Sequence, residues 1–265
     1  MVLSYKVTMS IWAIADLHLS FGVPDKSMHF FGKSWEKWTE KLHANWSKHI
    51  AKEDLVLLPG DISWAMRVED AVPDLDWIHQ LPGTKVMLKG NHDYWWTSLN
   101  KVEKVLPSSI QLIQNNAYLW NDVAIAGTRL WDTSEYQFGS YIDYQDNPKA
   151  RKLGEVDANG SEMERIFARE LSRLEMSLKA MSTKAGRRLA MTHYPAIGGE
   201  LKDSRVSELL QKYQVSDCVF GHLHNVRTGA LPFGQNGGVK FHLVSADYLD
   251  FMPLKIVETR EYGYI

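Results

Sequence analysis

Aspartate, asparagine and histidine recur directly after short apolar segments of this sequence. Asp16 and His18 follow the apolar residues 11–15. Four later groups share this position and composition: Gly60-Asp61, Gly90-Asn91-His92-Asp93, His193 and Gly221-His222-x-His224. Carboxylate, imidazole and amide oxygen suit Mn, Fe, Zn and similar divalent ions, and a carboxylate can bridge two of them. The residue types therefore indicate a metal site built from several separate segments.

The first pair, taken alone, has two interpretations. Residues two apart in an extended chain leave from the same face, so Asp16 and His18 could point at a common cation. The alternative is that Asp16 caps a turn and His18 lies in water, because motifs this short recur by chance. The four later groups favour the metal site.

Each polar group needs a strand that delivers it to a common edge. Five short apolar segments are predicted as buried strands that end at these groups: 11–15, 55–61, 85–93, 187–195 and 217–224. Periodicity alone does not distinguish the first of them from a buried helical turn. Short consecutive strands are also predicted between residues 111 and 127, with final strands at 239–245 and 253–258.

Three helical segments alternate with the strands. Residues 34–50 carry tryptophans and a leucine near helical spacing, with Ser34 as the predicted N-cap. Residues 161–182 have a stripe of methionine, leucine and other apolar side chains, and residues 202–213 are predicted as a short helix. The alternation predicts a layered α/β architecture rather than an all-α or all-β one.

The chain length fits one large α/β domain or two small ones, since it has 265 residues. No repeat, low-complexity tract or linker divides the sequence, so we predict a single domain over residues 1–265. Residues 128–160 are polar and aromatic with little periodicity. We expect this segment to be a lid or rim insertion.

Charge and cysteine content limit the partners and the compartment. The net charge of −2 and pI of about 6.6 give no global basic field, so we expect no duplex nucleic acid partner. The sequence shows no membrane span and suggests no obligate protein partner. The single cysteine, Cys218, excludes an internal disulfide and fits a reducing compartment. Residues 1–15 lack the features of a signal peptide, so we expect a cytoplasmic protein.

Taken in order and spacing, the five polar groups resemble the pattern of the calcineurin-like metallophosphoesterase superfamily. That pattern is D-x-H, G-D, G-N-H-D/E, H and G-H-x-H. The resemblance spans residues 16–224, and all five blocks are complete. It implies the metallophosphoesterase fold, a layered β-sandwich of two mixed sheets flanked by helices, with metals at the strand ends.

The resemblance also implies two metal ions per chain, divalent or trivalent, with Mn, Fe and Zn as the candidates. Two ligand sets follow from it: Asp16, His18, Asp61 and His224 for one ion, and Asp61, Asn91, His193 and His222 for the other. Asp61 belongs to both sets and is the expected bridge. The implied reaction is attack of a metal-bridged hydroxide on a phosphoester, without a covalent enzyme intermediate.

His92 receives no metal in this assignment. In the family, the histidine of G-N-H lies at the phosphate and protonates or stabilises the leaving oxygen, which implies a catalytic role for His92. Asp93 is a second catalytic candidate, because it could orient His92. It could instead bond nearby backbone, and the frequency of aspartate in turns favours that structural role.

Aromatic residues near the blocks suggest where the substrate binds. They occur in four stretches: 21–35, Trp64, 94–96 and 129–144. Their rings could stack on a base or cover an apolar group, although packing of Trp95 and Trp96 against the sheets is the alternative. Arg129 and Arg227 are candidate contacts for non-bridging phosphate oxygens or for a second charged group of the substrate, and surface salt bridging is an equal alternative for each.

The sequence therefore predicts a two-metal phosphohydrolase that acts on a small organophosphate, with a nucleotide-like phosphodiester as the favoured substrate. Trp64 stands where the protein phosphatase branch has an aspartate, and His92 stands where lipid A pathway hydrolases typically carry arginine. The alternatives are a phosphomonoesterase, a lipid-linked pyrophosphate hydrolase, or a catalytically idle metal-binding scaffold. Complete ligand sets and His92 favour an active enzyme over the scaffold.

Overall fold

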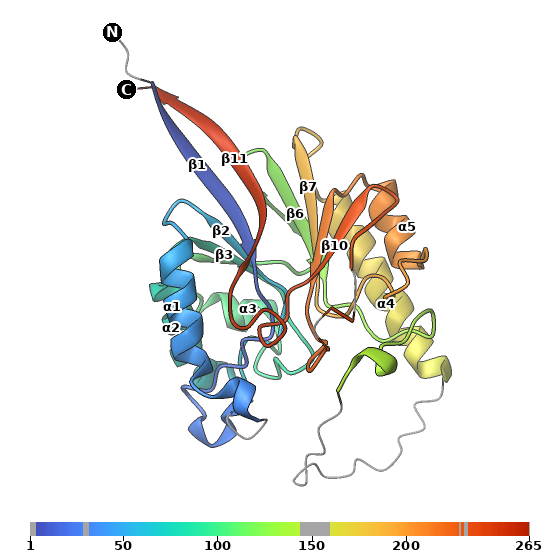
Figure 1. Cartoon of the computed structure of the whole chain (residues 1–265), viewed down its shortest axis with the longest axis horizontal. Helices are drawn as coiled ribbons and strands as arrows, with labels where there is room; N and C mark the ends of the chain where they lie inside the picture. The colour runs from blue at the N-terminus through green and yellow to red at the C-terminus, as the bar shows by residue number, and fades with distance from the viewer. Residues whose placement is uncertain (1–3, 29–31, 144–159, 228, 231–232, 265) are drawn as a thin grey trace.

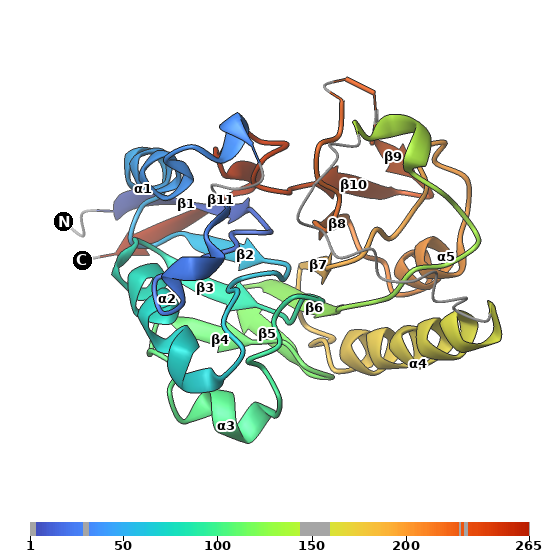
Figure 2. The same cartoon turned by 90° about the horizontal axis from the view of Figure 1, so that it is seen from below.

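The computed structural model describes residues 4–28, 32–143, 160–227, 229–230 and 233–264. Two mixed β-sheets pack face to face, and helices cover both outer faces (Figures 1 and 2). The first sheet has five strands in the order β11-β1-β2-β3-β4. Their bounds are Leu254–Tyr264, Ser4–Ala13, Leu55–Leu58, Thr84–Met87 and Ile110–Leu112. Only β11 runs antiparallel to its neighbour, and the long β1–β11 pair projects beyond the other strands (Figure 1).

The second sheet has six strands in the order β5-β6-β7-β8-β10-β9. Their bounds are Ala117–Trp120, Val123–Thr128, Arg187–Thr192, Asp217–Phe220, Val239–Leu243 and Gln235–Asn236. The four central strands are parallel, and the edge strands β5 and β9 are antiparallel to their neighbours. The two mixed sheets confirm the predicted fold class.

Alternating side chains divide each strand between two cores, because successive residues of a strand face opposite sides. Ile11 and Ala13 of β1 lie between the sheets, whereas Trp12 faces the helices on the outside of the first sheet. In β6, Ile125 lies between the sheets and Ala124 faces the helices of the second sheet. The central strands are therefore apolar on both faces, as the uninterrupted apolar segments predicted.

Among the described residues, five α-helices form the outer layers. Helices α1 (Trp38–His49), α2 (Val68–Gln80) and α3 (Leu99–Glu103) pack on the first sheet. Helices α4 (Gly160–Lys179) and α5 (Arg205–Lys212) pack on the second sheet (Figure 1). None of the described helices combines the length and the apolar composition that a transmembrane span requires.

Several predicted boundaries differ from the structure. The helix predicted at 34–50 begins only at Trp38, because Lys37 before it has a left-handed backbone with φ 52°, and Ser34 lies in a short 3-10 helix instead. The strand predicted at 11–15 begins at Ser4 and ends at Ala13. Helix α2 was not predicted. Within the predicted lid, residues 128–143 are mostly irregular, and residues 144–159 lie outside the described part of the chain.

Candidate metal centre

The polar groups converge because the parallel strands of both sheets end at the same side of the molecule. Loops after β1, β2 and β3 carry the residues of the first sheet, and loops after β7 and β8 carry those of the second. The backbone joins the two sheets at this point. The N–H of Ala15 donates to the Val244 carbonyl at 2.7 Å, and the Ala15 carbonyl accepts the Ala246 N–H at 3.0 Å.

Four predicted ligand residues have a left-handed backbone: Asp16, His18, Asp61 and His222, with φ of 58°, 46°, 53° and 70°. This conformation is uncommon for residues with a side chain, and it is maintained only where surrounding contacts enforce it. Hydrogen bonds from Asp16 N to the Gly60 carbonyl and from His18 N to the Asp61 carbonyl, both 3.0 Å, supply such contacts. The sharp turns redirect the side chains into one cluster.

Two glycines leave room for the carboxylates. A Cβ at Gly90 would overlap the carboxylate of Asp61, and a Cβ at Gly221 would overlap that of Asp16. The Asp16 carboxylate accepts the His222 N–H at 2.9 Å, immediately after Gly221. The glycines of the predicted blocks therefore permit close approach of backbone to the clustered acids.

The first predicted ligand set is assembled in the structure. Potential ligand atoms of Asp16, His18 and His224 all lie within 4.8 Å of one another. His224 Nε2 is 3.2 Å from His18 Nε2 and 3.9 Å from Asp16 Oδ1. The fourth member, Asp61, places Oδ2 3.7 Å from His18 Nε2.

The second predicted ligand set meets on the other side of Asp61. Asn91 Oδ1 is 2.6 Å from His193 Nε2 and 3.0 Å from His222 Nδ1. Asp61 Oδ1 lies 3.5 Å from His193 Nε2. Asp61 thus presents a different oxygen to each set. Asp16 also lies near this set, since ligand atoms of Asp16, Asp61 and His193 are mutually within 4.8 Å.

Hydrogen bonds orient two of the imidazoles. Nδ1–H of His193 donates to the Pro59 carbonyl at 3.0 Å, and Nδ1–H of His224 donates to Asp247 Oδ1 at 2.9 Å. In the neutral form of each ring the lone pair is then on Nε2, the atom that faces the cluster. Asp247 also accepts the Asn225 N–H at 2.8 Å, so it holds the loop as well as the ring.

Sequence reasoning missed Asp247. It follows the strand predicted at 239–245, and an acid just beyond a strand end was the available signal. No glycine or histidine stands beside it to complete one of the recognised groups.

Burial sets the protonation of the cluster in the absence of a bound cation. It raises the pKa of Asp16 to about 8, with a contribution from the nearby Asp61, and it raises the pKa of Asp61 as well. Burial also lowers the pKa of His193 to about 3 and that of His222 to about 2, and lowers the pKa of His18. These three imidazoles are therefore neutral at pH 7, the form that binds metals.

His224 is the exception among the imidazoles. Burial alone would lower its pKa, but the carboxylates of Asp247, Asp16 and Asp61 outweigh that effect and raise it to about 9. Two buried acids, one amide oxygen and four imidazoles form a mixed oxygen and nitrogen donor set. This set fits two divalent ions of the Mn, Fe or Zn type.

His92 lies beside the cluster without joining either ligand set. Its backbone N–H donates to Asp61 Oδ1 at 2.8 Å, and its ring centroid is 4.7 Å from that of Trp64. Trp64 also stacks on His18 at 4.8 Å and an interplanar angle of 20°. Nδ1 of His92 is buried and has no hydrogen-bond partner among the described residues. The ring is thus held at the edge of the cluster by packing.

Asp93 makes the hydrogen bonds to nearby backbone that a structural role requires. Its buried carboxylate accepts four donors: the N–H groups of Gly90, Ile62 and Ser63 and the indole N–H of Trp95, at 2.8–3.1 Å. Within the described part of the chain, no hydrogen bond joins it to the His92 ring. Asp93 therefore ties the loop after β3 to the loop after β2.

The structure brings Arg129 towards the cluster but leaves Arg227 on the rim. Burial raises the pKa of Asp61, and the positive charge of Arg129 opposes that rise, so the two side chains lie within electrostatic reach. The Arg129 guanidinium lies over the Trp131 ring, 4.7 Å from its centroid. Arg227 is 53% exposed and contacts Ser140 and Asp143 of the rim.

An aromatic cavity of about 320 Å³ opens beside the second ligand set. Trp131, Tyr136 and Phe138 line it together with His222. Tyr194, which the sequence analysis did not single out, also lines it and packs its ring 4.0 Å from that of His222. The predicted rim therefore contributes a concave surface.

The aromatic residues after the G-N-H block differ in their exposure to solvent. Trp95 and Trp96 are buried, as the packing alternative expected. Tyr94 is 49% exposed, and its ring lies 6.1 Å from that of His92. In this stretch only the exposed tyrosine stands at the edge of the cluster.

Comparison with known proteins adds a family match. A family model described as calcineurin-like phosphoesterase matches residues 9–226, which is most of the chain and contains every block of the cluster. No curated protein matches the chain at a significant level.

Two solved structures are similar over nearly their full length. Phosphopantetheinyl hydrolase from Mycobacterium tuberculosis matches 94% of this chain and 96% of its own, with 16% identity and a TM-score of 0.50. A protein of unknown function from Aquifex aeolicus matches 93% of this chain and 95% of its own, with 14% identity and a TM-score of 0.45. At such low identity, the first similarity indicates a shared fold.

Proposed function

We propose that this chain, which belongs to the calcineurin-like phosphoesterase family and is a metal-dependent phosphoester hydrolase, acts on a small organophosphate through two metal ions. The observation that carries the proposal is the position of Asp61. One of its oxygens lies 3.7 Å from His18 Nε2 and the other lies 3.5 Å from His193 Nε2. A carboxylate with one oxygen towards each of two ligand sets is what a dinuclear site requires.

The proposed ligands follow the two sets. Asp16, His18, Asp61 and His224 would hold one ion, and Asp61, Asn91, His193 and His222 would hold the other. Two bound ions supply an activated water near neutral pH and neutralise charge on the phosphoryl oxygens. The protein contributes the tautomers of His193 and His224 and the tight turns that aim the ligands.

We assign His92 to the leaving oxygen. Its backbone is anchored to Asp61 and its ring packs on Trp64, so the imidazole is positioned beside the ligands while its Nδ1 makes no hydrogen bond to a described residue. A ring held in this way can donate a proton to, or hydrogen-bond, the departing group. Such general acid help is typically worth ~10²–10⁴ in rate.

The aromatic cavity is the proposed site for the organic part of the substrate. It opens at His222, a proposed ligand, so a phosphate at the ions would place an attached group against Trp131 and Phe138. Its volume of about 320 Å³ suits a small organic group rather than a duplex. Aromatic walls favour a base or an apolar group, which supports a nucleotide-like phosphodiester.

A substrate panel tests the proposal on protein loaded with defined metals. The panel contains nucleotides, cyclic nucleotides, phosphopeptides, a phosphopantetheinyl ester, a lipid-linked pyrophosphate and duplex DNA. We expect hydrolysis of a small phosphodiester with an aromatic or apolar group to be fastest. Fastest cleavage of a phosphomonoester or of the lipid-linked pyrophosphate would favour those alternatives, and no turnover with two ions bound would favour a scaffold.

A cavity variant tests the location of the organic group. Phe138→Ala should lower kcat/KM for an aromatic diester about tenfold more than for its methyl analogue, because base stacking is typically worth ~1–3 kcal/mol. Leu119→Ala is the matched control, since Leu119 is an exposed apolar residue of β5. Unchanged preference in the folded Phe138→Ala variant would exclude this cavity.

A further inference from the structure

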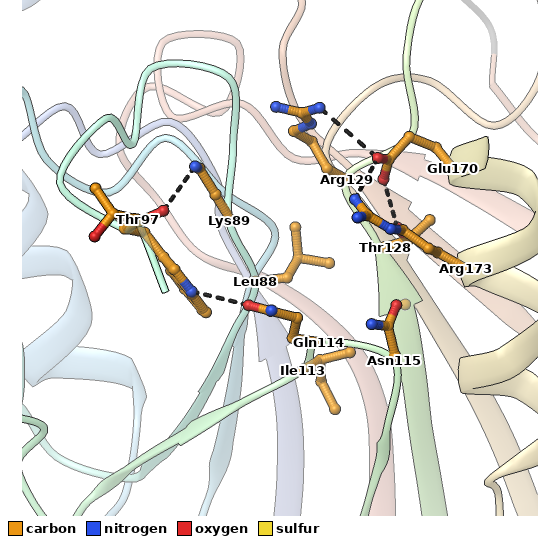
Figure 3. A pocket seen from close by; sticks show the side chains of 12 residues that line it. Leu88, Lys89, Thr97, Ile113, Gln114, Asn115, Thr128, Arg129, Glu170 and Arg173 are labelled. Atoms are coloured by element: carbon orange, nitrogen blue, oxygen red, sulfur yellow. Dashed lines mark hydrogen bonds and ion pairs between the residues drawn. The ribbon is translucent and has the colours of Figure 1, made fainter. Parts of the chain in front are cut away.

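A second cavity, of about 240 Å³, lies where the two sheets meet and has polar walls (Figure 3). Lys89 from the loop after β3 stands on one side. Arg129, just after β6, stands on the other side with Glu170 and Arg173 of α4 (Figure 3). The site described above uses neither Lys89 nor Arg173.

The lining of the cavity has a positive net charge, whereas the net charge of the whole chain is negative. Its lining contains three cationic side chains, Lys89, Arg129 and Arg173, and a single carboxylate, Glu170, which leaves two positive charges in excess. The net charge of the whole chain is −2. Local excess charge inside a concave site attracts an anion more strongly than the same charge on an open surface.

The Glu170 carboxylate connects the residues on its side of the cavity through hydrogen bonds. It is 2% exposed, accepts the Thr128 hydroxyl at 3.0 Å and accepts a guanidinium N–H of Arg173 at 2.7 Å. Arg129 lies farther away, with its Nη2 3.8 Å from Glu170 Oε1. The carboxylate thus fixes Arg173 and attracts Arg129 without saturating either guanidinium.

Donors remain available to a ligand. No described residue accepts a hydrogen bond from the Arg129 guanidinium, whose plane is steadied by the Trp131 ring at 4.7 Å. Lys89 Nζ donates one hydrogen bond, to the Trp96 carbonyl at 2.7 Å, and has two further N–H groups. A guanidinium and an ammonium that face one cavity suit the oxygens of a phosphate.

Both walls of the cavity are connected through the chain to the candidate metal centre. Lys89 precedes Gly90, whose close approach to the Asp61 carboxylate leaves no room for a Cβ. On the other wall, the Arg129 carbonyl accepts the N–H of Tyr194 at 2.9 Å, and Tyr194 directly follows His193. Because both walls continue directly into loops of the metal centre, we expect an anion held here to lie near a phosphate bound at the ions.

We propose that this cavity binds a second phosphate group of the substrate, separate from the phosphate that is cleaved. The proposal rests on the proposed function and narrows it to organophosphates that carry at least two phosphate groups. The aromatic cavity would take the organic part, and the cavity of Lys89, Arg129 and Arg173 would take the additional phosphate.

Phosphate binding to the metal-loaded protein tests the subsite directly. Calorimetric titration with inorganic phosphate should find two phosphates per chain, one at the ions and one in the cavity. Lys89→Gln and Arg173→Gln should each weaken the second binding event about tenfold or more, as expected for loss of a charge-assisted contact. Arg173 is 45% exposed, so its replacement should not prevent folding.

Arg169→Gln is the matched control. Arg169 stands on the same helix and lies 3.7 Å from the same Glu170, but it does not line the cavity. The Arg169→Gln variant should bind two phosphates per chain, as the unchanged protein does. A single phosphate in the unchanged protein, or an equal effect of all three substitutions, would overturn the subsite.

A substrate pair tests whether the subsite serves catalysis. Thymidine 5′-(p-nitrophenyl phosphate) and its 3′-phosphorylated derivative differ by one phosphate group. The added phosphate should lower KM about tenfold in the unchanged protein and in Arg169→Gln, and the advantage should disappear in Lys89→Gln and Arg173→Gln. Equal KM values for the pair in the unchanged protein would contradict the role in substrate binding.

The two experiments separate this proposal from the proposed function. If two phosphates bind but no phosphoester is hydrolysed, the subsite stands and the proposed function fails. If both substrates are hydrolysed alike and one phosphate binds, the function stands and the subsite fails.

Discussion

The pKa values of the buried carboxylates at two places in this protein are shifted in opposite directions, although burial acts on all of them in the same way. Asp16 and Asp61 lie beyond the ends of β1 and β2, where burial raises the pKa of both, that of Asp16 to about 8. Asp217 lies at the start of β8 and is equally buried. Burial would raise its pKa too, but hydrogen bonds from His242, Arg187 and Ser216 outweigh it and lower the pKa to about 2.

The difference lies in the partners. Arg187 places Nη2 2.7 Å from Asp217 Oδ2, so that carboxylate has a cation supplied by the protein itself. Asp16 and Asp61 are surrounded mostly by imidazoles that are neutral at pH 7. A paired acid stabilises the fold, whereas a buried cluster of acids and neutral imidazoles is arranged to receive cations from solution.

Asp61→Asn should have the largest effect, because it removes the one carboxylate shared by both ligand sets. Affinity for both metals should fall by more than the ~10–100-fold that follows loss of a residue supporting a ligand, and hydrolysis should be lost with it. The metal-free protein should not become less stable, since an amide avoids burying a charge and its oxygen can still accept the His92 N–H. Metal content after dialysis and thermal unfolding without metal check both expectations.

Asp217→Asn serves as the control and should retain both metals. Two ions bound to Asp61→Asn with unchanged affinity would show that the clustered acids are not a metal site.

His92→Asn should separate turnover from metal binding. We expect kcat to fall by ~10²–10⁴ for an alkoxide leaving group, because a general acid is lost, while both ions remain bound. An activated nitrophenyl leaving group needs less proton donation and should be affected less. A near-normal kcat on the substrate with the alkoxide leaving group would show that His92 does not act as the general acid.

Asp247→Asn should weaken the cluster without deleting a ligand. The carboxylate accepts Nδ1–H of His224, and loss of such a supporting contact typically lowers metal affinity or activity ~10–100-fold. Metal affinity is best measured by competition with a chelator. Asp250→Asn is the matched control, because Asp250 is an exposed aspartate in the same loop. Equal affinities of the two variants would mean that His224 is oriented without Asp247.

These positions also show what the sequence can and cannot reveal. Asp16, His18 and Asp61 were recognised because each stands directly beyond an apolar segment, and parallel strands bring their carboxyl ends to one edge. That rule is local, so it works from sequence. The rule did not identify Asp247, because the role of Asp247 depends on the end of β10 lying beside the loop after β8. Its hydrogen bond to His224 joins residues that are 23 positions apart in the sequence.

Helix α4 shows a second limit. Its apolar spacing correctly predicted which face is buried, with Phe167 and Leu174 on it. Glu170 and Ser177 lie on that same face, although helical periodicity gives buried positions to apolar residues by default. Glu170 is tolerated there because Thr128 and Arg173 satisfy it, and neither partner can be inferred before the sheet and helix are packed.

Asp217→Asn should have the smallest effect, confined to stability. The pKa of Asp217 falls from an ordinary 3.8 to about 2, which corresponds to about 2 kcal/mol at pH 7. A lowered pKa in the folded state stabilises above the unfolded pKa, and this stability is lost as the pH falls from about 4 towards 2. Urea unfolding at pH 7 and pH 3 should therefore show a smaller difference between Asp217→Asn and the unchanged protein at the lower pH.

Asp25→Asn, at an exposed aspartate, is the control for that comparison and should change stability little. A difference for Asp217→Asn that grew as the pH fell would reverse the sign and contradict the pairing with Arg187 and His242.

Titration of the metal-free protein with Mn²⁺, followed by hydrolysis of bis(p-nitrophenyl) phosphate, tests the dinuclear phosphoesterase most directly. The number of bound ions and the initial rate are measured on the same samples. The two ligand sets around Asp61 predict a rate that rises until two ions are bound per chain and then becomes constant. A rate that reaches its maximum with one bound ion, or no hydrolysis with two ions bound, would contradict a two-metal phosphoesterase.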